Sequence, residues 1–464
     1  MSWDLAVMTA SELAEGFRRK RFSPIEATEA ALRRIRSLNE RVNAFCFVAE
    51  EEALAAARAS AARYQAGTPL GPIDGVPTTV KDLVLTKGWP TLRGSRTVDP
   101  KQDWAEDAPA TARLREHGAV LLGKTTTPEF GWKGVTDNSL TGITRNPWQL
   151  DRTPGGSSGG AAVAAATGMG ALHIGTDGGG SIRIPASFTG IFGLKPSYGR
   201  VPAYPSSPFA AVSHLGPMTR SVRDAALMLS VMAQPDPRDA NALPHDGRDW
   251  SIGLDSGVRA LRIAYAPTIN QRPVDAGIAA SVASAAVAFA DLGATVETID
   301  LTLPEVDEVF AAHWFAPAAT LLAGFTDAQR EMIDPGLRAI AAEGAKLSAR
   351  DYIAAGRKRE GFAITMNLLF ERYDLVLSPT LPITAFEAGY ETPRTGPYAR
   401  WTGWTPFTYP FNLTRHPAAS MPCGFVDGLP VGLQIIGPMH RDDLVLRAAR
   451  AFESGMPIQL PNLD

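Results

Sequence analysis

The sequence predicts an α/β protein in which a large, mixed and twisted β-sheet lies between helical layers. Short continuous apolar runs, such as residues 119–123 and 375–379, are typical of strands that are covered on both faces. Helical patterns occur between these runs, which indicates helices packed around one sheet. Of the 464 residues, 45% are hydrophobic and 20% are charged, so the chain is expected to bury a large core.

Helices are expected over the N-terminal region, residues 1–66. A helix start is encoded at residues 23–26, where a serine N-cap precedes a proline and a glutamate that can reach back to the cap. Helical periodicity continues over residues 27–38. A second helix is predicted over residues 53–64, and Gly67 is expected to end it.

Strand patterns begin at about residue 70. Residues 75–82 resemble a strand that runs into a loop. Residues 261–266 and 294–299 are strand-like, and a helical pattern over residues 276–292 separates them. This order predicts a βαβ unit. The Pro-, Asp- and Gly-rich stretch 235–258 is expected to be a loop.

One domain is expected over residues 1–464, because neither a repeat nor a low-complexity linker divides the chain. Its expected parts are the N-terminal helices (1–66), a core with the catalytic residues (67–235), a variable helical region around the substrate pocket (236–370) and a C-terminal return to the core sheet (371–464).

Charge and composition exclude several classes of protein. The net charge is −3 and the pI is about 6.2, so no broad surface for nucleic acid is expected. The basic run 18–21 is interpreted as a solvated helix face. The two cysteines, Cys46 and Cys423, form no disulfide framework, which favours a reducing cytoplasm.

Neither a membrane segment nor a metal site is expected. Residues 1–4 lack the basic and apolar parts of a signal peptide. The most apolar helical stretch, residues 277–290, is too short to span a bilayer. The seven histidines show no ligand spacing. We therefore expect neither a metal nor another cofactor.

The densest motif signal lies between residues 153 and 200. Two glycine-rich segments each carry a serine that is a candidate for catalysis, Ser157 and Ser181. Glycine lets the backbone approach a ligand closely. The run of Gly178, Gly179 and Gly180 directly before Ser181 is typical of an oxyanion hole beside a nucleophile, where each N–H donor contributes roughly 2.7–4 kcal/mol.

A serine hydroxyl is a poor nucleophile until a base accepts its proton. No histidine lies close to these serines in the sequence, but Lys81 lies in a strand-like segment that is expected to be buried. Burial lowers the pKa of a lysine, so a buried lysine can act as a base near pH 7. Ser157 could then pass a proton from Ser181 to Lys81.

The chain resembles the amidase-signature family over nearly its whole length, most closely over residues 70–235. Segments 80–82, 155–160 and 177–185 stand in the family's order, with Ser157 and Ser181 at the family's spacing. Further matching segments are residues 193–200, 216–220 and 417–438.

This resemblance implies the amidase-signature fold and assigns roles to individual residues. Ser181 would be the acylated nucleophile, Ser157 the middle serine after a cis peptide bond, and Lys81 the base. The N–H groups of residues 178–181 would form the oxyanion hole, with Ser158 beside the catalytic residues. Asp177 and Arg183 flank the nucleophile; we expect them to pair and hold the loop, the alternative being that Arg183 binds a substrate carboxylate.

Two other motif matches have competing interpretations. Residues 118–125 fit the P-loop pattern, but their variable positions are apolar and strand-like, which disfavours nucleotide binding. Residues 155–159 fit the nucleophile elbow of α/β-hydrolase-like esterases, with Ser157 as nucleophile and a histidine base. No apolar strand precedes them. The histidines available for that role are His214, His245, His313, His416 and His440.

Within the family, the sequence favours a stand-alone, bacterial-type amidase of small molecules that resembles the aryl-acylamidase, nylon-oligomer hydrolase and urethanase branch. Its expected substrates are aryl amides, with carbamates (urethanes) and aryl esters as alternatives. A non-catalytic scaffold and a glutamine-dependent amidotransferase A-type subunit remain alternatives. Residues 300–375 do not resemble the amidotransferase protein. A homodimer is compatible with the sequence, whereas nucleic-acid and membrane partners are not expected.

Aromatic residues of the variable segments could line an apolar substrate pocket or simply fill the core. The segment 204–214 and the stretch 398–409 are the main sources of these side chains. The candidates for the pocket are Trp132, Phe209, Trp314, Trp401 and Trp404.

Overall fold

The computed structural model describes residues 4–209 and 211–463. Residues 1–3, on which the expectation of no signal peptide partly rests, lie outside the described residues, as does Ala210 within the predicted pocket segment. None of the described helices combines the length and the apolar character that crossing a bilayer requires.

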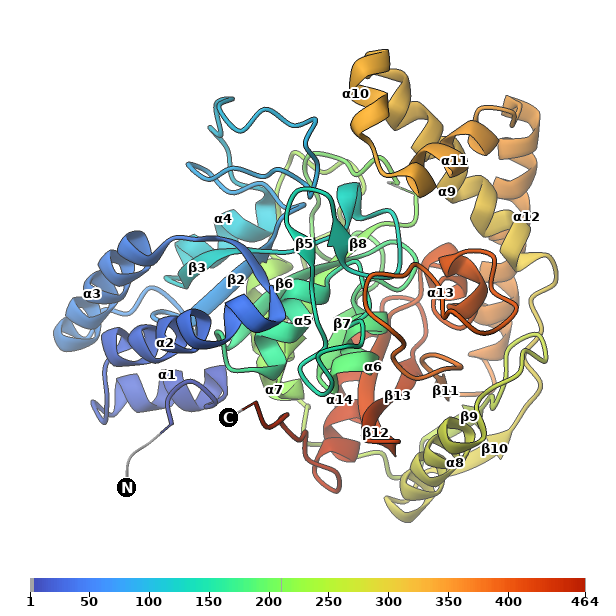
Figure 1. The fold of residues 1–464 in the computed structure, drawn as a ribbon. Coiled ribbons are helices and arrows are strands. Elements are labelled where there is room, and N and C mark those ends of the chain that lie inside the picture. The colour runs from blue at the N-terminus through green and yellow to red at the C-terminus, as the bar shows by residue number, and fades with distance from the viewer. Residues whose placement is uncertain (1–3, 210, 464) are drawn as a thin grey trace.

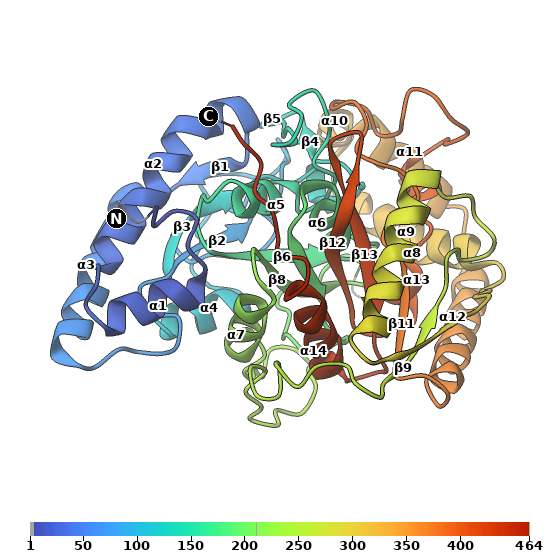
Figure 2. The ribbon, with the colours of Figure 1, turned by 90° about the horizontal axis from the view of Figure 1, so that it is seen from below.

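An eleven-stranded mixed sheet runs through the molecule in the order β1-β3-β2-β6-β8-β7-β12-β13-β11-β9-β10, with helices on both faces (Figures 1 and 2). Its strands are β1 (Phe45–Val48), β2 (Pro77–Lys81), β3 (Val120–Thr125), β6 (Leu172–Asp177), β7 (Phe192–Lys195), β8 (His214–Thr219), β9 (Arg262–Tyr265), β10 (Thr295–Thr298), β11 (Leu375–Pro379), β12 (Ala418–Val426) and β13 (Leu429–Ile436). The short strands β4 (Asp137–Asn138) and β5 (Gly142–Ile143) form a separate hairpin. The predicted α/β fold with a large mixed sheet is confirmed.

The α-helices vary widely in length. They are α1 (Ala10–Arg18), α2 (Pro24–Val42), α3 (Glu50–Ala66), α4 (Pro109–Glu116), α5 (Gly159–Ala166), α6 (Arg183–Thr189), α7 (Val222–Met232), α8 (Ala276–Asp291), α9 (Val306–Ala323), α10 (Asp327–Met332), α11 (Pro335–Gly344), α12 (Ala349–Leu369), α13 (Pro410–Leu413) and α14 (Asp442–Glu453). Helices α9 to α12 gather at one side of the molecule (Figure 1), where α9 packs against α11 and α12.

Alternation along β3 shows how the two helical layers arise. Leu121 belongs to the core that includes α1, α7, α8 and α14, whereas Val120 and Leu122 point to the core under α2, α3 and α5. Successive side chains of a strand face opposite sides of the sheet, so a continuous apolar run is required where both sides are covered.

Several local predictions are confirmed. The Ser23 hydroxyl accepts a hydrogen bond from the Glu26 N–H, and the Ser23 N–H donates one to the Glu26 carboxylate, so α2 begins with a capping box. Helix α3 ends at Gly67, whose φ is 75°. Strands β9 and β10 pair in parallel around α8, as the predicted βαβ unit requires.

Two N-terminal predictions need correction. Residues 1–66 also contain β1, which pairs antiparallel with β3 at the edge of the sheet and shows no strong strand pattern of its own. The basic run 18–21 is exposed, but it lies across the end of α1 instead of within a helix. Lys20 has a φ of 55°, which ends the helical path there.

Candidate active site

Lys81 is the last residue of β2, in the interior of the sheet between β3 and β6. Its side chain is fully buried. The Lys81 Nζ lies 2.7 Å from Ser157 Oγ, 2.9 Å from Ser158 Oγ and 2.8 Å from Thr176 Oγ1. Three hydroxyl groups therefore surround the amine.

Burial sets the protonation of this amine. Removal from water holds the pKa of Lys81 well below its usual value, and the negative charge of Asp177 opposes this shift only in part. No carboxylate of the described residues lies within ion-pair distance of the Lys81 Nζ. The neutral amine is thus favoured, and a neutral amine can accept a proton.

Ser157 lies on the loop directly before α5, and the Gly156–Ser157 peptide bond is cis. The resemblance to the family implied this bond. Helix α5 consists of small residues, and a Cβ atom on Gly160 would lie 2.4 Å from the backbone nitrogen of Thr126. Glycine at this position therefore lets α5, and with it Ser157, lie close against the segment that follows β3.

Ser181 lies between β6 and α6 and is largely buried. The two serine loops touch, because the N–H of Ser158 donates to the carbonyl oxygen of Ser181 at 3.1 Å. Among the described residues, no hydrogen bond joins the hydroxyl groups of Ser157 and Ser181. Catalytic hydrogen bonds often tighten only when substrate is bound, so direct proton transfer between these hydroxyls stays a prediction.

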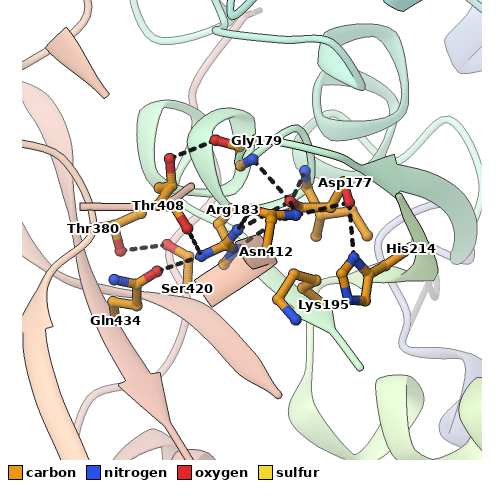
Figure 3. A network of polar contacts seen from close by, with 12 residues as sticks. Asp177, Gly179, Arg183, Lys195, His214, Thr380, Thr408, Asn412, Ser420 and Gln434 are labelled. Carbon is orange, nitrogen blue, oxygen red and sulfur yellow. Dashed lines mark hydrogen bonds and ion pairs between the residues drawn. The ribbon is translucent and has the colours of Figure 1, made fainter. Parts of the chain in front are cut away.

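A buried ion pair holds the loop that carries Ser181 (Figure 3). Arg183 Nε and Nη2 each lie 3.0 Å from an oxygen of Asp177. Burial alone would raise the pKa of the Asp177 carboxyl, but Arg183 brings it below its usual value. The carboxylate also accepts the N–H groups of Gly180 and Ile182 at 2.8 and 3.2 Å.

The guanidinium of Arg183 has no N–H left for a substrate. Its other hydrogen bonds reach the Thr408 carbonyl, Gln434 Oε1 and Asn412 Oδ1, at 2.8, 2.7 and 2.6 Å. All five N–H donors are therefore used inside the protein. The expected ion pair is present, and the alternative that Arg183 reads a substrate carboxylate does not fit this geometry.

Sequence reasoning missed several residues of this network. Asn412 donates to the carbonyl oxygen and to Oδ1 of Asp177, and the Thr408 hydroxyl donates to the Gly179 carbonyl at 2.7 Å (Figure 3). No motif marked either residue. For Gln434, the one signal in the sequence was its position in the segment 417–438, which resembles the family. No sequence pattern indicated that Thr176 contacts Lys81.

The predicted oxyanion hole needs one correction. The N–H of Gly180 is donated to Asp177 Oδ1 at 2.8 Å, so it is not free for a substrate oxygen. No described hydrogen bond involves the N–H groups of Gly178, Gly179 or Ser181. These three donors stay candidates for the hole. The physical reason is that Arg183 fixes the Asp177 carboxylate at hydrogen-bond distance from the Gly180 N–H.

The five aromatic candidates occupy two different surroundings. Trp314 and Trp401 lie against the glycine loop, since a Cβ atom on Gly178 or Gly179 would meet their rings at 2.9 Å. Phe209 stacks on Trp314, with ring centroids 3.9 Å apart. Trp314 also donates its indole N–H to the carbonyl of Trp132.

Trp404 is a core residue. It is fully buried between Phe188 and Phe386, and its indole N–H donates to the Glu391 carbonyl at 3.0 Å. The assignment of the other four to a substrate pocket stays a prediction, because none of them is among the described lining of the cavity of about 330 Å³ that Thr176 borders.

A cavity of about 330 Å³ is lined in part by Thr176, a hydrogen-bond partner of Lys81, and none of the five aromatic candidates is among its described lining. It is bounded by the residues after β2, by η1 (Glu129–Gly131), by the end of β6 and by the segment 197–215. Its lining includes Leu83, Val84, Arg93, Ala108, Phe130, Thr176, Tyr198, Val201, Tyr204, Pro205, His214, Asp239 and Leu321. Thr176 joins the cavity to Lys81 through its hydrogen bond.

The two competing motif interpretations do not fit the structure. Residues 120–125 of the P-loop match form β3, and Lys124 is buried there, donating to the Val84 carbonyl. For the nucleophile elbow, no strand of the described chain lies directly before Ser157. Its hydroxyl contacts Lys81, and none of the five candidate histidines forms a described hydrogen bond with it.

Comparison with known proteins places the chain among amide-cleaving enzymes and their relatives. The family model described as Amidase matches residues 26–446. An acylamidase of Rhodococcus erythropolis is 37% identical, with 97% of this chain and 96% of the relative covered. The A-type subunit of the glutamyl-tRNA(Gln) amidotransferase of Symbiobacterium thermophilum is 36% identical, with 96% of each chain covered.

Among solved structures, a bacterial aryl acylamidase of the amidase signature family superimposes with a TM-score of 0.90. It is 34% identical, and the match covers 97% of this chain and 96% of that chain.

Proposed function

Because the chain belongs to the amidase family of C–N amide hydrolases, we propose that it hydrolyses small-molecule amides with Ser181 as nucleophile, Ser157 as relay and Lys81 as base. The observation that carries this proposal is the buried Lys81 amine, which has hydroxyl partners and, among the described residues, no carboxylate partner. A structural lysine buried at this depth would normally be paired with a carboxylate.

The proposed reaction proceeds through an acyl-enzyme. Neutral Lys81 accepts a proton from Ser157 as Ser157 accepts one from Ser181, and the Ser181 oxygen attacks the carbonyl carbon. The N–H groups of Gly178, Gly179 and Ser181, for which no partner occurs among the described residues, stabilise the negative oxygen. The relay then returns the proton to the departing amine. Water attacks the acyl-enzyme by the same route, which releases the acid and restores Ser181.

Ser158 and Thr176 orient the base in this scheme. Ser158 Oγ donates to the Thr176 carbonyl and accepts the Thr176 N–H, both at 3.1 Å. These contacts fix the Ser158 hydroxyl beside the Lys81 Nζ. The amine is thereby held toward Ser157, and the step from Ser157 to Lys81 needs no large movement.

Aryl amides are the proposed substrate class, with carbamates (urethanes) and aryl esters as further substrates of the same acyl-enzyme chemistry. The names of an acylamidase relative and of an aryl acylamidase structure support amides of this type. Action as a stand-alone enzyme in the cytoplasm, without cofactor and with the option of a homodimer, belongs to the same proposal.

The test is release of 4-nitroaniline from anilides and from a matched aryl carbamate. Wild type is compared with Ser181→Ala, Ser157→Ala and Lys81→Ala, and with Ser139→Ala as an exposed control. Loss of several orders of magnitude in the three site variants alone supports the relay. Substantial activity in Ser181→Ala, together with none in Ser157→Ala, would refute the assignment of the nucleophile.

An amidotransferase A-type subunit is the second candidate, because curated relatives of that kind match at 36% identity, as closely as the acylamidase does at 37%. That function predicts release of ammonia from glutamine and a need for partner chains. Anilide turnover by the isolated chain, without glutaminase activity, would favour the amidase. A non-catalytic scaffold would not be labelled at Ser181 by a fluorophosphonate probe.

A further inference from the structure

Neighbouring residues connect the 330 Å³ cavity to the catalytic relay at two points, near Ser157 and near Lys81. A Cβ atom on Gly131 would lie 3.3 Å from Ser157 Oγ and 2.7 Å from Leu83 Cδ1. Leu83 and Phe130 line the cavity. Gly131 therefore lies between the Ser157 hydroxyl and the cavity wall. Thr176 adds a second point of contact through Lys81.

In the proposed reaction, Ser157 delivers the proton to the departing amine. The group that receives a proton must lie beside its donor. The cavity next to Ser157 is therefore placed to hold the leaving group, while the aromatic rings against Gly178 and Gly179 lie toward the nucleophile loop.

Arg93 gives this cavity a positive charge. Its backbone is held in a left-handed conformation with φ of 56°, because its N–H donates to the Asp82 carbonyl and its own carbonyl accepts the Phe130 N–H. Among the described residues, the guanidinium has no hydrogen-bond or ion-pair partner. Burial lowers the pKa of Arg93, and the nearby Asp82 carboxyl counteracts this effect only in part.

The other charged groups near the cavity do not neutralise Arg93. Asp239 is the one acidic residue in its described lining, and its two oxygens already accept the N–H groups of Ala203 and Asn241 at 2.8 Å. Asp82 lies toward Lys124, at 3.7 Å from its Nζ. A half-buried guanidinium without a counter-ion is costly unless an anion binds there.

We propose that the cavity binds the leaving group of the substrate and that Arg93 selects leaving groups that bear a carboxylate. This inference rests on the proposed amide hydrolysis. A planar guanidinium matches a carboxylate through two parallel hydrogen bonds. Apolar lining from Leu83, Phe130 and Leu321 suits the body of an aryl or short alkyl amine. The favoured substrates are thus N-acyl derivatives of amino acids whose amine and carboxylate are several bonds apart, such as acylated aminobenzoates.

The test compares substrates that share a shape and differ in charge. The 3- and 4-acetamidobenzoates carry a carboxylate, and the 3- and 4-nitroacetanilides carry a neutral nitro group in its place. Steady-state kcat/KM is measured for wild type, Arg93→Gln, Arg93→Lys and Arg33→Gln. Arg33 is an exposed control whose contact with Glu29 spans 3.9 Å.

Arg93→Gln should lower kcat/KM for at least one acetamidobenzoate by about tenfold or more relative to its nitro counterpart. Arg93→Lys should retain part of the preference, and Arg33→Gln all of it. Equal losses on charged and neutral substrates, or no change in their ratio, would overturn the role of Arg93 while leaving amide hydrolysis in place.

Calorimetric binding of 3- and 4-aminobenzoate to Ser181→Ala provides a measurement that does not depend on turnover. Binding should weaken about tenfold or more when Arg93→Gln is added to that variant. If both variants bind the aminobenzoates equally well, or neither binds them, the carboxylate site is refuted. Normal aminobenzoate binding without turnover of any amide would instead refute the proposed function.

Discussion

Replacement of Arg183 by methionine would measure how strongly its buried ion pair stabilises the nucleophile loop. The change removes five hydrogen bonds to buried acceptors, two of them to Asp177. Breaking a buried pair by removing one partner costs about 3–5 kcal/mol. Asp177 keeps the N–H groups of Gly180 and Ile182 and the amide of Asn412, so we expect the free energy of unfolding to fall by about 3 kcal/mol.

The assay is urea denaturation followed by tryptophan fluorescence at pH 7 and pH 5, with Arg33→Met as the control. In wild type, the pKa of Asp177 is lower in the folded state than in the unfolded state. The stability that its charge contributes is present above the unfolded pKa and is lost as the pH falls. In Arg183→Met, burial without the guanidinium should raise the pKa of Asp177 instead. The difference in free energy of unfolding between wild type and this variant should therefore be smaller at pH 5 than at pH 7.

The control should change the free energy of unfolding by less than about 1 kcal/mol, since its ion pair is exposed. A loss below about 1 kcal/mol in Arg183→Met, or a deficit that is the same at both pH values, would refute the conclusion that this pair supports the loop.

Three further outcomes are expected. Lys81→Met should lower kcat by about 10²–10⁴-fold without loss of thermal stability, because burial lowers the pKa of this amine and so favours its neutral form. A melting temperature that drops sharply would indicate a structural lysine instead. The kcat/KM of wild type should fall as the pH is lowered through the depressed pKa of Lys81. The negative charge of Asp177 raises this pKa, so Asp177→Asn should move the fall in kcat/KM to lower pH. A pH profile that is unchanged or shifted to higher pH would contradict the assignment of Lys81 as the base. Trp404→Ala should reduce the free energy of unfolding by about 3–5 kcal/mol, because the indole is fully buried. At a temperature where the variant is folded, its KM for anilides should be unchanged. A raised KM with normal stability would place Trp404 in the pocket.

The sequence alone determined the features that depend on neighbouring residues. The apolar runs predicted β3 and β11, the capping box predicted the start of α2, and the βαβ pattern predicted β9, α8 and β10. These signals are local because a strand or helix is recognised by the spacing of side chains within one segment. The serine motifs and Lys81 were likewise visible as short patterns.

Tertiary structure decided which groups surround those motifs. Asn412 and Thr408 reach the nucleophile loop from the C-terminal part of the chain, and Arg93 meets the cavity through a loop after β2. The Gly180 N–H finds its acceptor only because Asp177 is fixed by Arg183. Hydrogen bonds between distant segments depend on how the sheet and helices pack, and side-chain spacing within one segment carries no record of that packing.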